Sequence, residues 1–499
     1  MNGNAMGNGT GMSAGAGEGA GMSASAGAGS GDGKGKGGGP KADALVLFGI
    51  TGDLAKKMLL PALYRLTARG ELNVPVIGVA KSDWDDEALR SHAREAIADV
   101  YEVDDEVFGR LADKLSIETG DYTDGATFSR LRDRVRDHGF LSHYLAIPPS
   151  LFATVAEGLA GVGLNENARL VVEKPFGHNL ASARALNAEL QKYFDEDHLL
   201  RVDHFLGSEP VDGLMIARFA NTLLEPLWNR SYIDNVQISL SEDFDVADRG
   251  SFYDSVGALR DVVQNHLLQV LAYLIMEPPS SPDAQAWLNE KQRALSAVRA
   301  IDPADVVRGQ YEGYLGVEGV KPGSTTETFI ALKLLIDNWR WAGVPFYIRS
   351  GKCMSVSSTE VIVELRRPPV TLFKTAEGEA PPNLLRFRME PKAGMTFDLL
   401  VEQPGNEDKP VPVPLSVDFS TVLGPGEMPY EHILSGAISG NPELFTRFDL
   451  VEESWRIVEP ILDPPETPEP YAVGTDGPAP AETLPGSNGW HVLEGVRER

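Results

Sequence analysis

The feature of the sequence that most constrains the fold is a glycine-containing turn between an apolar segment and a helix-like one. Residues 44–50 (ALVLFGI) form an apolar run of the length of one strand, and residues 54–70 (LAKKMLLPALYRLTARG) have the pattern of a helix. The glycines lie between the two segments. A strand, a turn and a helix in this order are the opening of a βαβ unit.

Three later segments are also short, apolar and strand-like. They are residues 74–80 (VPVIGVA), 142–149 (SHYLAIPP) and 168–177 (ARLVVEKPFG), and helical patterns lie between them. Because strands that alternate with helices form parallel sheets, this part of the chain is predicted to be a doubly wound α/β fold.

After about residue 210 the pattern changes to longer segments in which polar and apolar residues alternate. Such alternation predicts an antiparallel sheet with one solvated or helix-covered face. The long apolar stretch at residues 254–277 predicts helices that pack against this sheet. The alternating segments are residues 232–244, 326–337, 360–368 and 383–391.

The length of 499 residues, 42% of them hydrophobic, is enough for two hydrophobic cores. We therefore expect an α/β domain over residues 41–210 and an α+β domain over residues 211–470. Residues 1–40 contain almost no bulky apolar side chain and predict a disordered Gly/Ala/Ser-rich extension. Residues 471–499 are rich in Pro and Gly and predict an irregular tail.

Composition also limits the partners and the compartment. The 72 acidic and 45 basic residues give a net charge of −27, which repels nucleic acid and anionic membrane surfaces. No stretch has the character of a signal peptide or of a membrane span. The single cysteine, Cys353, forms no internal disulfide. We expect a soluble, cytoplasmic protein that binds neither nucleic acid nor membranes, and that holds any anionic substrate with local Lys, Arg or His.

The turn at residues 49–55 (GITGDLA) has the pattern of a phosphate-binding loop. Glycine lets the backbone approach a pyrophosphate, and the following helix offers unpaired N–H groups and a favourable dipole. An ordinary glycine turn is the alternative; the strand before, the helix after and a second strand roughly thirty residues on favour a dinucleotide site. The predicted cofactor contacts are Gly49, Thr51, Gly52, Asp53, Leu54 and Ala55.

The second strand ends in Lys81 and Ser82. NAD-specific domains usually place an acidic residue here to bind the ribose hydroxyls, whereas a cation suits a 2′-phosphate. The position therefore favours NADP as the cofactor, with a solvated surface lysine as the alternative.

A set of segments in a fixed order resembles the glucose-6-phosphate dehydrogenase family. The resemblance covers about residue 42 to residue 465. It rests on the segments GITGDLAKK, IGVAKS, AIPP, VVEKPFG, RVDHFLGSEPV, RFAN, WNR, ALRDVVQNHLLQ, RGQYEGY, STTETFIALKLLIDNWRWAGVPFYIRSGK and LFTRFDLVEESWRIVEPIL.

The resemblance implies a Rossmann-like, NADP-binding domain followed by an α+β domain with a large, mainly antiparallel sheet. It implies a homodimer, or a dimer of dimers, formed through that sheet. It also implies oxidation of the C1 hydroxyl of glucose 6-phosphate to a lactone, with hydride transfer to NADP, at the entry to the pentose phosphate pathway. No metal is expected.

By position, the resemblance makes His266 the general base and Asp203 the carboxylate that orients it. This assignment is chemically consistent, because C1 releases a hydride easily only as its hydroxyl loses a proton, and histidine accepts protons near neutral pH. A carboxylate partner fixes the imidazole tautomer and stabilises the imidazolium. The residues alone would instead favour a polar histidine on the face of a helix.

Other site residues follow from the same resemblance. Lys174 matches a position beside both cofactor and substrate, and Pro175 shapes the bend through a cis bond; a strand-end turn with a solvated lysine is the alternative. Glu242 and Asp261 match acceptors for the sugar hydroxyls, although without the resemblance they would count as exposed carboxylates. The remaining predicted substrate contacts are His204, Ser208 and Lys352.

The sequence departs from the family at the substrate phosphate. Where the family usually has DHYLGKE, this chain has Phe205 and Ser208 in place of Tyr and Lys, and Ser357 replaces a later Lys. Two hypotheses follow: cations from another loop compensate, or the substrate is a sugar without a 6-phosphate or with another substituent. A non-catalytic NADP-binding relative is a third possibility. Such a relative would be expected to have lost the base or the glycine turn, and both are present in this sequence.

Overall fold

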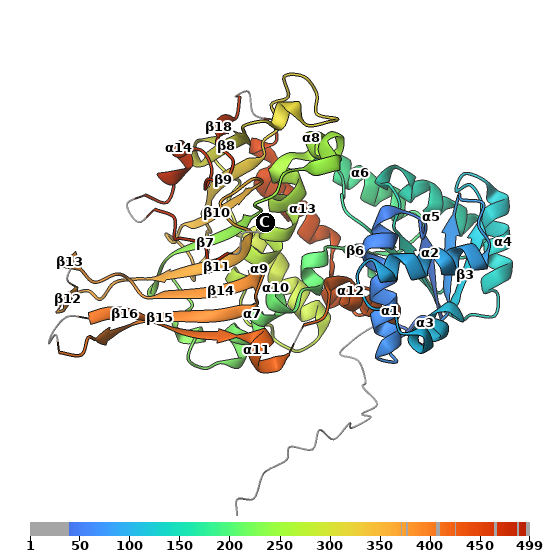
Figure 1. The fold of residues 1–499 in the computed structure, drawn as a ribbon, viewed down its shortest axis with the longest axis horizontal. Helices are drawn as coiled ribbons and strands as arrows, with labels where there is room; N and C mark the ends of the chain where they lie inside the picture. Colours follow the sequence, from blue (N-terminus) through green and yellow to red (C-terminus); the bar gives the residue numbers. More distant parts are fainter. Residues whose placement is uncertain are drawn as a thin grey trace, which may run out of the picture. The chain divides into compact units, whose positions relative to one another are not determined.

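The computed structural model describes residues 39–370, 372–375, 378–405, 410–424, 426–463, 467–486 and 489–495 (Figure 1). The extension predicted for residues 1–40 lies outside these residues, apart from Gly39 and Pro40. Among the described residues, no helix combines the length and the apolar character needed to cross a membrane.

The N-terminal part contains a seven-stranded sheet in the order β17-β6-β5-β4-β1-β2-β3. Its six N-terminal strands are parallel, which confirms the predicted doubly wound sheet, and β17 pairs antiparallel with β6 at one edge. β1, β4 and β5 are buried at every position, as expected for strands of a parallel sheet that is covered on both faces. The strands are β1 (Ala44–Phe48), β2 (Val76–Ala80), β3 (Leu115–Thr119), β4 (Leu141–Leu145), β5 (Ala168–Val172), β6 (Leu199–Val202) and β17 (Phe445–Thr446).

Helices cover both faces of this sheet (Figure 1). One apolar core lies between the sheet and α1, α2, α3 and α12, and a second lies between the sheet and α4, α5 and α6. The helices are α1 (Leu60–Ala68), preceded by the π-helix η1 (Ala55–Leu59), α2 (Asp86–Ala98), α3 (Asp105–Ala112), α4 (Gly125–Val135), α5 (Phe152–Gly161), α6 (Leu180–Leu190) and α12 (Pro429–Ser439).

The C-terminal part contains a nine-stranded sheet in the order β16-β15-β14-β11-β7-β10-β9-β8-β18. The pairs β7–β10 and β8–β18 are parallel and the other pairs are antiparallel, so the predicted antiparallel character is confirmed. The strands are β7 (Ile233–Ser241), β8 (Val306–Tyr311), β9 (Phe329–Leu334), β10 (Phe346–Gly351), β11 (Ser358–Leu365), β14 (Leu384–Glu390), β15 (Gly394–Glu402), β16 (Pro410–Asp418) and β18 (Glu469–Tyr471), with a separate hairpin of β12 (Lys374–Thr375) and β13 (Gly378–Glu379).

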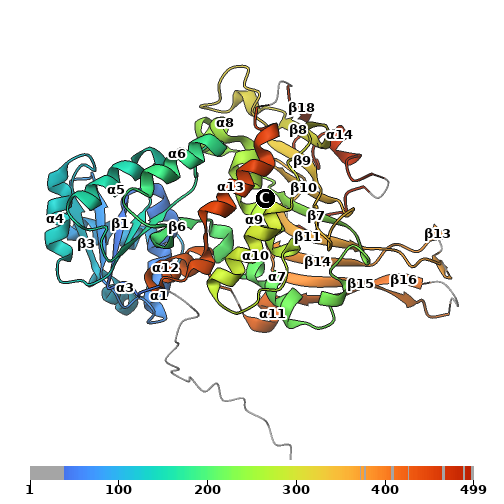
Figure 2. The ribbon, with the colours of Figure 1, turned by 180° about the vertical axis from the view of Figure 1, so that it is seen from behind.

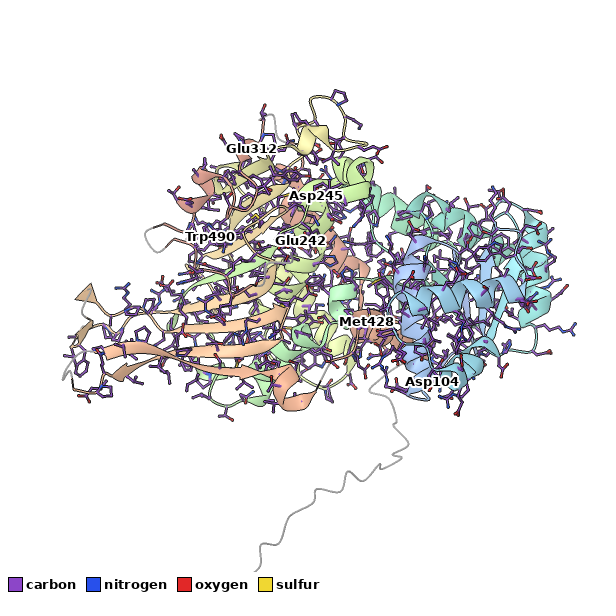
Figure 3. The ribbon with its side chains drawn as sticks, viewed as in Figure 1. Asp104, Glu242, Asp245, Glu312, Met428 and Trp490 are labelled. Carbon is purple, nitrogen blue, oxygen red and sulfur yellow. The ribbon has the colours of Figure 1, made fainter. Side chains whose placement is uncertain are left out.

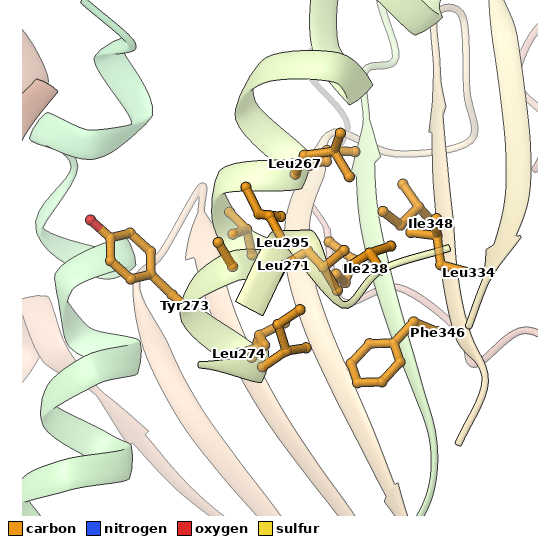
Figure 4. Packing of buried hydrophobic residues seen from close by; sticks show 14 of the residues in the cluster. Ile238, Leu267, Leu271, Tyr273, Leu274, Leu295, Leu334, Phe346 and Ile348 are labelled. Carbon is orange, nitrogen blue, oxygen red and sulfur yellow. The ribbon is translucent and has the colours of Figure 1, made fainter. Parts of the chain in front are cut away.

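Helices pack on one face of this sheet and enclose the largest apolar core (Figures 2 and 4). Leu267, Leu271 and Leu274 point toward Ile238 and Phe346 of the sheet (Figure 4). The predicted helical stretch 254–277 forms three consecutive segments, of which the middle one is a π-helix. The helical elements are η4 (His204–Gly207), α7 (Glu209–Ala220), α8 (Gly250–Ala258), η7 (Leu259–Leu267), α9 (Leu268–Ile275), α10 (Ala284–Ser296), α11 (Phe419–Leu423) and α13 (Phe448–Val458).

Residues from 472 onward form one short helix, α14 (Ala479–Glu482), and otherwise no regular element among the described positions. Part of this segment lies against the nine-stranded sheet (Figure 3). The Trp490 ring packs under the guanidinium of Arg349 at 4.5 Å, and Gln237 exchanges hydrogen bonds with the backbone of residues 489 and 491. The predicted irregular tail therefore contacts the sheet through specific side chains.

The two parts of the described chain share structure. Helix α12 and strand β17 come from the C-terminal part of the sequence, yet Tyr430, Ile433 and Phe445 belong to an apolar core of the N-terminal sheet. The domain boundary at residue 210 therefore remains a prediction. A segment of the C-terminal part, which contains α12 and β17, packs on the seven-stranded N-terminal sheet.

Candidate active site

The turn after β1 has a backbone geometry that requires glycine. Gly49 has φ +79°, and a Cβ atom at this position would lie 2.2 Å from the carbonyl oxygen of Ala146. The amide of Gly52 donates to the carbonyl of Gly49 at 2.9 Å and closes the turn. The helical segment that follows has no side-chain cap at Leu54, and the start of a helix is a position where an anion can bind. The other predicted contacts, Thr51, Asp53 and Ala55, lie in this same turn and helix start.

The predicted 2′-phosphate contacts lie at the end of β2, next to the turn. The hydroxyl of Ser82 donates to the Thr51 hydroxyl at 3.2 Å, which joins the two loops. Lys81 is exposed, and its Nζ atom lies 2.7 Å from Oδ2 of Asp121. The hydrogen bond from Lys81 lowers the pKa of Asp121. Lys81 is therefore an exposed cation that pairs with Asp121 and directly precedes Ser82.

Asp203 and His266 form a buried pair. Asp203 follows β6 at the carboxyl end of the parallel sheet, and His266 lies in η7. Nδ1 of His266 is 2.5 Å from Oδ1 of Asp203, and both side chains are 4% exposed. The same oxygen accepts from the amide of Phe205 at 3.1 Å, which fixes the carboxylate. Water therefore has little access to screen this interaction.

Lys174 joins this pair on the other side of the imidazole. Its Nζ atom lies 2.9 Å from Nε2 of His266 and donates to the carbonyl of Asp261 at 2.8 Å. The carboxylate of Asp261 is 3.4 Å from the same Nζ atom. The peptide bond between Lys174 and Pro175 is cis, as the resemblance implied.

The surroundings set the protonation states of these groups. Burial opposes ionisation of Asp203, but its hydrogen bond and electrostatic interaction with His266, together with smaller contributions from His204 and Lys174, outweigh burial and lower the pKa of Asp203 to about 2. Burial lowers the pKa of His266, and Lys174 lowers it further, although Asp203 acts in the opposite direction. The imidazole is therefore neutral at neutral pH, with Nδ1–H donated to the carboxylate. Nε2 keeps its lone pair, which a base requires.

Two aromatic side chains enclose His266. The ring of His204 meets the His266 ring edge-on at 4.5 Å between centroids, and Phe205 stacks on it at 4.4 Å. Burial, together with the charges of His266 and Lys174, lowers the pKa of His204 to about 3. His204 is thus neutral at neutral pH.

Several residues at the predicted sugar and phosphate subsites already have partners within the protein. Lys352 Nζ lies 2.7 Å from Glu242 Oε2, so the predicted cation and acceptor already pair with each other. Glu242 is labelled in Figure 3. Ser357 donates to Asp243 Oδ1 at 2.6 Å and accepts from the Asp243 amide. Ser208 precedes α7, and its side chain makes no capping bond there.

Asp203, His204 and His266 also bring three ligand atoms to within 4.8 Å of one another. This is the one cluster of that kind in the part of the chain that the structure describes. Within this cluster, Nδ1 of His266 and Oδ1 of Asp203 are hydrogen-bonded to each other.

Sequence reasoning missed a second buried network behind this site. The hydroxyl of Tyr144 donates to Oε1 of Glu173 at 2.6 Å, and burial raises the pKa of Glu173 to about 7. Tyr430 of α12 also bonds to Glu173, and its ring stacks at 6.1 Å on His204. Glu173 directly precedes Lys174 in the segment VVEKPFG and could have been recognised there. Tyr430 was not, because it lies more than two hundred residues later in the chain.

Comparisons with known proteins agree with this arrangement. The family model described as "Glucose-6-phosphate dehydrogenase, NAD binding domain" matches residues 46–213, and the corresponding C-terminal domain model matches residues 215–491. "Glucose-6-phosphate 1-dehydrogenase 1" of Mycobacterium tuberculosis (strain CDC 1551 / Oshkosh) is 47% identical over 453 residues, which cover 91% of this chain and 97% of that protein.

Two solved structures are similar over most of the chain. The crystal structure of glucose-6-phosphate 1-dehydrogenase from Mycobacterium avium is 47% identical, has a TM-score of 0.83, and is matched over 90% of this chain and 99% of its own. A glucose-6-phosphate dehydrogenase in complex with glucose 6-phosphate is 32% identical and has a TM-score of 0.85. The match covers 91% of this chain and 100% of that one. The chain therefore belongs to the glucose-6-phosphate dehydrogenase family.

Proposed function

We propose that this protein is an NADP-dependent glucose-6-phosphate 1-dehydrogenase, which oxidises the C1 hydroxyl to give 6-phosphogluconolactone. The observation that carries the proposal is the Asp203–His266 pair with Lys174 on its far side, at the carboxyl end of the sheet. The glycine turn after β1 opens at this same end, where ligands of doubly wound sheets bind.

In the proposed reaction, His266 takes the proton of the C1 hydroxyl at Nε2. Asp203 is ionised throughout and stabilises the imidazolium that forms. Nζ of Lys174 lies 2.9 Å from Nε2, so the sugar hydroxyl has to share or displace this contact. The released lysine ammonium then remains within reach of the same oxygen, where it favours the loss of the proton.

NADP, when bound, supplies the acceptor for the hydride that leaves C1. The residues present fit this cofactor, because a turn that only glycine can adopt at position 49, packed against the Ala146 carbonyl, joins a buried parallel strand to the start of a helix. We propose that Gly49, Thr51 and the residues up to Ala55 hold the pyrophosphate. Lys81 and Ser82 would hold the 2′-phosphate, with Lys81 exchanging Asp121 for the phosphate.

We assign Glu242 and Asp261 to the sugar hydroxyls, and Lys352, His204 and Ser208 to the remainder of the substrate. Each carboxylate already faces a lysine, so the substrate enters a site whose charges are balanced before it binds. The cofactor domain at residues 41–210, the substrate domain at residues 211–470, the cytoplasmic location and a homodimer or a dimer of dimers belong to the same proposal.

A second candidate has a specific observation in its favour. Phe205 stacks on His266 without a hydroxyl, and Ser357 bonds to Asp243, so neither offers the phosphate contact that the family places there. A sugar without a 6-phosphate would then be the substrate. The decisive measurement compares kcat/KM for glucose 6-phosphate and for free glucose with NADP. A preference for the phosphorylated sugar of more than about a hundredfold supports the first proposal, and equal values support the second.

The assay also tests the third possibility, a non-catalytic relative. The pair of Asp203 and His266 is assembled as a base requires, so we expect NADPH to form with at least one sugar. Absence of both NADP binding and turnover with a panel of sugars and sugar phosphates would refute catalytic function altogether.

A further inference from the structure

A cavity of about 500 Å³ lies between α7 and α10, beside residues 441–444. Its volume is within the range of small-molecule sites. Its lining contains none of the residues that we assign to cofactor, sugar or proton transfer. Most of its wall is apolar, formed by Met215, Ile216, Phe219, Ala220, Trp287, Leu288 and Leu444.

A buried ammonium group lies in the wall of this cavity. Lys291 is only 1% exposed, and its Nζ atom has no hydrogen-bond partner among the described residues. Its Nζ atom lies over the face of the Tyr273 ring, 4.2 Å from the centroid. A buried ammonium without an acceptor is costly, and orphaned polar atoms of this kind mark a position where an external partner is missing.

The acidic groups nearby limit the charge of that partner. Asp212 and Glu443 also line the cavity, so a doubly charged phosphate would meet repulsion. Burial raises the pKa of Asp212 to about 6. In its protonated form Asp212 donates a hydrogen bond, which a carboxylate oxygen can accept.

We propose that this cavity binds a small monocarboxylate with an aliphatic or aromatic body, and that the carboxylate pairs with the ammonium group of Lys291. The carboxylate supplies the acceptor that Lys291 lacks, in a charge-assisted hydrogen bond. The apolar wall, with Phe219 and Trp287 edge-to-face at 5.8 Å, receives the body of the ligand. Exposed Ile216, at 64%, marks the solvent side of the cavity.

The charged groups around Lys291 predict how binding depends on pH. Burial lowers the pKa of Lys291 to about 7, while Asp203 and Asp212 act in the opposite direction. Asp212 in turn is affected by His432, Glu443 and Glu209. Because only the protonated lysine pairs with the ligand, we expect about tenfold weaker binding at about pH 8 than at about pH 6.

The test is calorimetric titration of the full-length protein with 3-phenylpropionate, phenylacetate and 4-methylpentanoate. The uncharged match is 3-phenylpropanol. We expect saturable binding of at least one acid, and at least tenfold weaker binding of the alcohol. Lack of saturation by every acid up to about 10 mM, or equal binding of the alcohol, would overturn the proposal.

Two variants locate the site, and a third serves as the control. Lys291→Met should weaken binding at least tenfold and keep the thermal midpoint, because it removes an unpaired buried charge. Ile216→Glu adds a repelling charge at an exposed position and should also weaken binding. Arg293→Met changes the 75% exposed cation of the same helix and should bind like the wild type. Wild-type affinity in Lys291→Met would refute the assignment.

Discussion

Replacement of Asp203 by Asn removes the charge that faces His266 while it preserves the size of the side chain. The two side chains are 4% exposed and 2.5 Å apart, so solvent screens their interaction little. In the ground state His266 is neutral, and the carboxylate serves mainly to orient it. The charge acts in full only as the imidazole takes a proton, and the variant therefore reports on the transition state.

The magnitude follows from the burial of the pair. Loss of one partner of a buried ion pair costs about 3–5 kcal/mol. Since about 1.36 kcal/mol corresponds to a factor of ten, and the proton is only partly transferred in the transition state, we expect kcat to fall by about 10²- to 10³-fold. KM for the sugar should change little. Asp203 raises the pKa of His266, so its neutralisation should also move the acid limb of kcat/KM to lower pH.

The assay is NADPH formation at saturating glucose 6-phosphate and NADP, from about pH 5 to pH 9. Asp254→Asn is the matched control, because Asp254 is a buried carboxylate that accepts hydrogen bonds from Tyr314 and Ser324 and does not contact His266. Its kcat should stay within about threefold of the wild type. If Asp203→Asn also stays within threefold, or if its acid limb moves to higher pH, then His266 is not the base that Asp203 supports.

Three further substitutions test other parts of the site. Lys174→Gln should lower kcat/KM at least a hundredfold, and it should raise the pKa of His266, so the acid limb moves opposite to that of the Asp203 variant; an unmoved limb would refute the contact. Lys81→Ala should raise KM for NADP about fivefold to tenfold and leave KM for NAD unchanged; equal changes would exclude a 2′-phosphate contact. Phe205→Tyr should lower KM for glucose 6-phosphate about tenfold without effect on free glucose, and an unchanged KM would place the phosphate elsewhere.

Sequence reasoning identified the strands whose apolar residues are consecutive. β1 is apolar at every position, and β5 has Leu170, Val171 and Val172 in a row after Arg169. β3 and β6 escaped prediction because a charged residue interrupts their shorter apolar patterns. Glu118 of β3 pairs with Arg130 at 2.6 Å, and Arg201 of β6 pairs with Glu196 at 2.8 Å. A strand pattern does not reveal that a distant partner will neutralise such a residue.

The contacts of the C-terminal segment depend on tertiary structure in the same way. A composition rich in Pro and Gly correctly indicates few regular elements, but it carries no information about the surface on which the segment lies. Nε2 of His491 is 2.9 Å from Glu364 of β11, and Trp490 lies on Arg349 of β10. These partners exist only after the nine-stranded sheet has formed.

The π-helix η7 explains why Asp261 and His266 reach the same lysine. Five residues along an α-helix correspond to about 500° of rotation, which would leave the two side chains about 140° apart around the axis. A π-helix bonds each residue to the fifth one along the chain and so brings such a pair to one face. On this face, the carboxylate of Asp261 lies 3.4 Å and Nε2 of His266 lies 2.9 Å from Nζ of Lys174. The apolar pattern of residues 254–277 predicts a helix but does not distinguish an α-helix from a π-helix. The residue types of the site could therefore be recognised in the sequence. The placement of Asp261 and His266 on one helix face could not, because it depends on the π-helical geometry, which the apolar pattern does not encode.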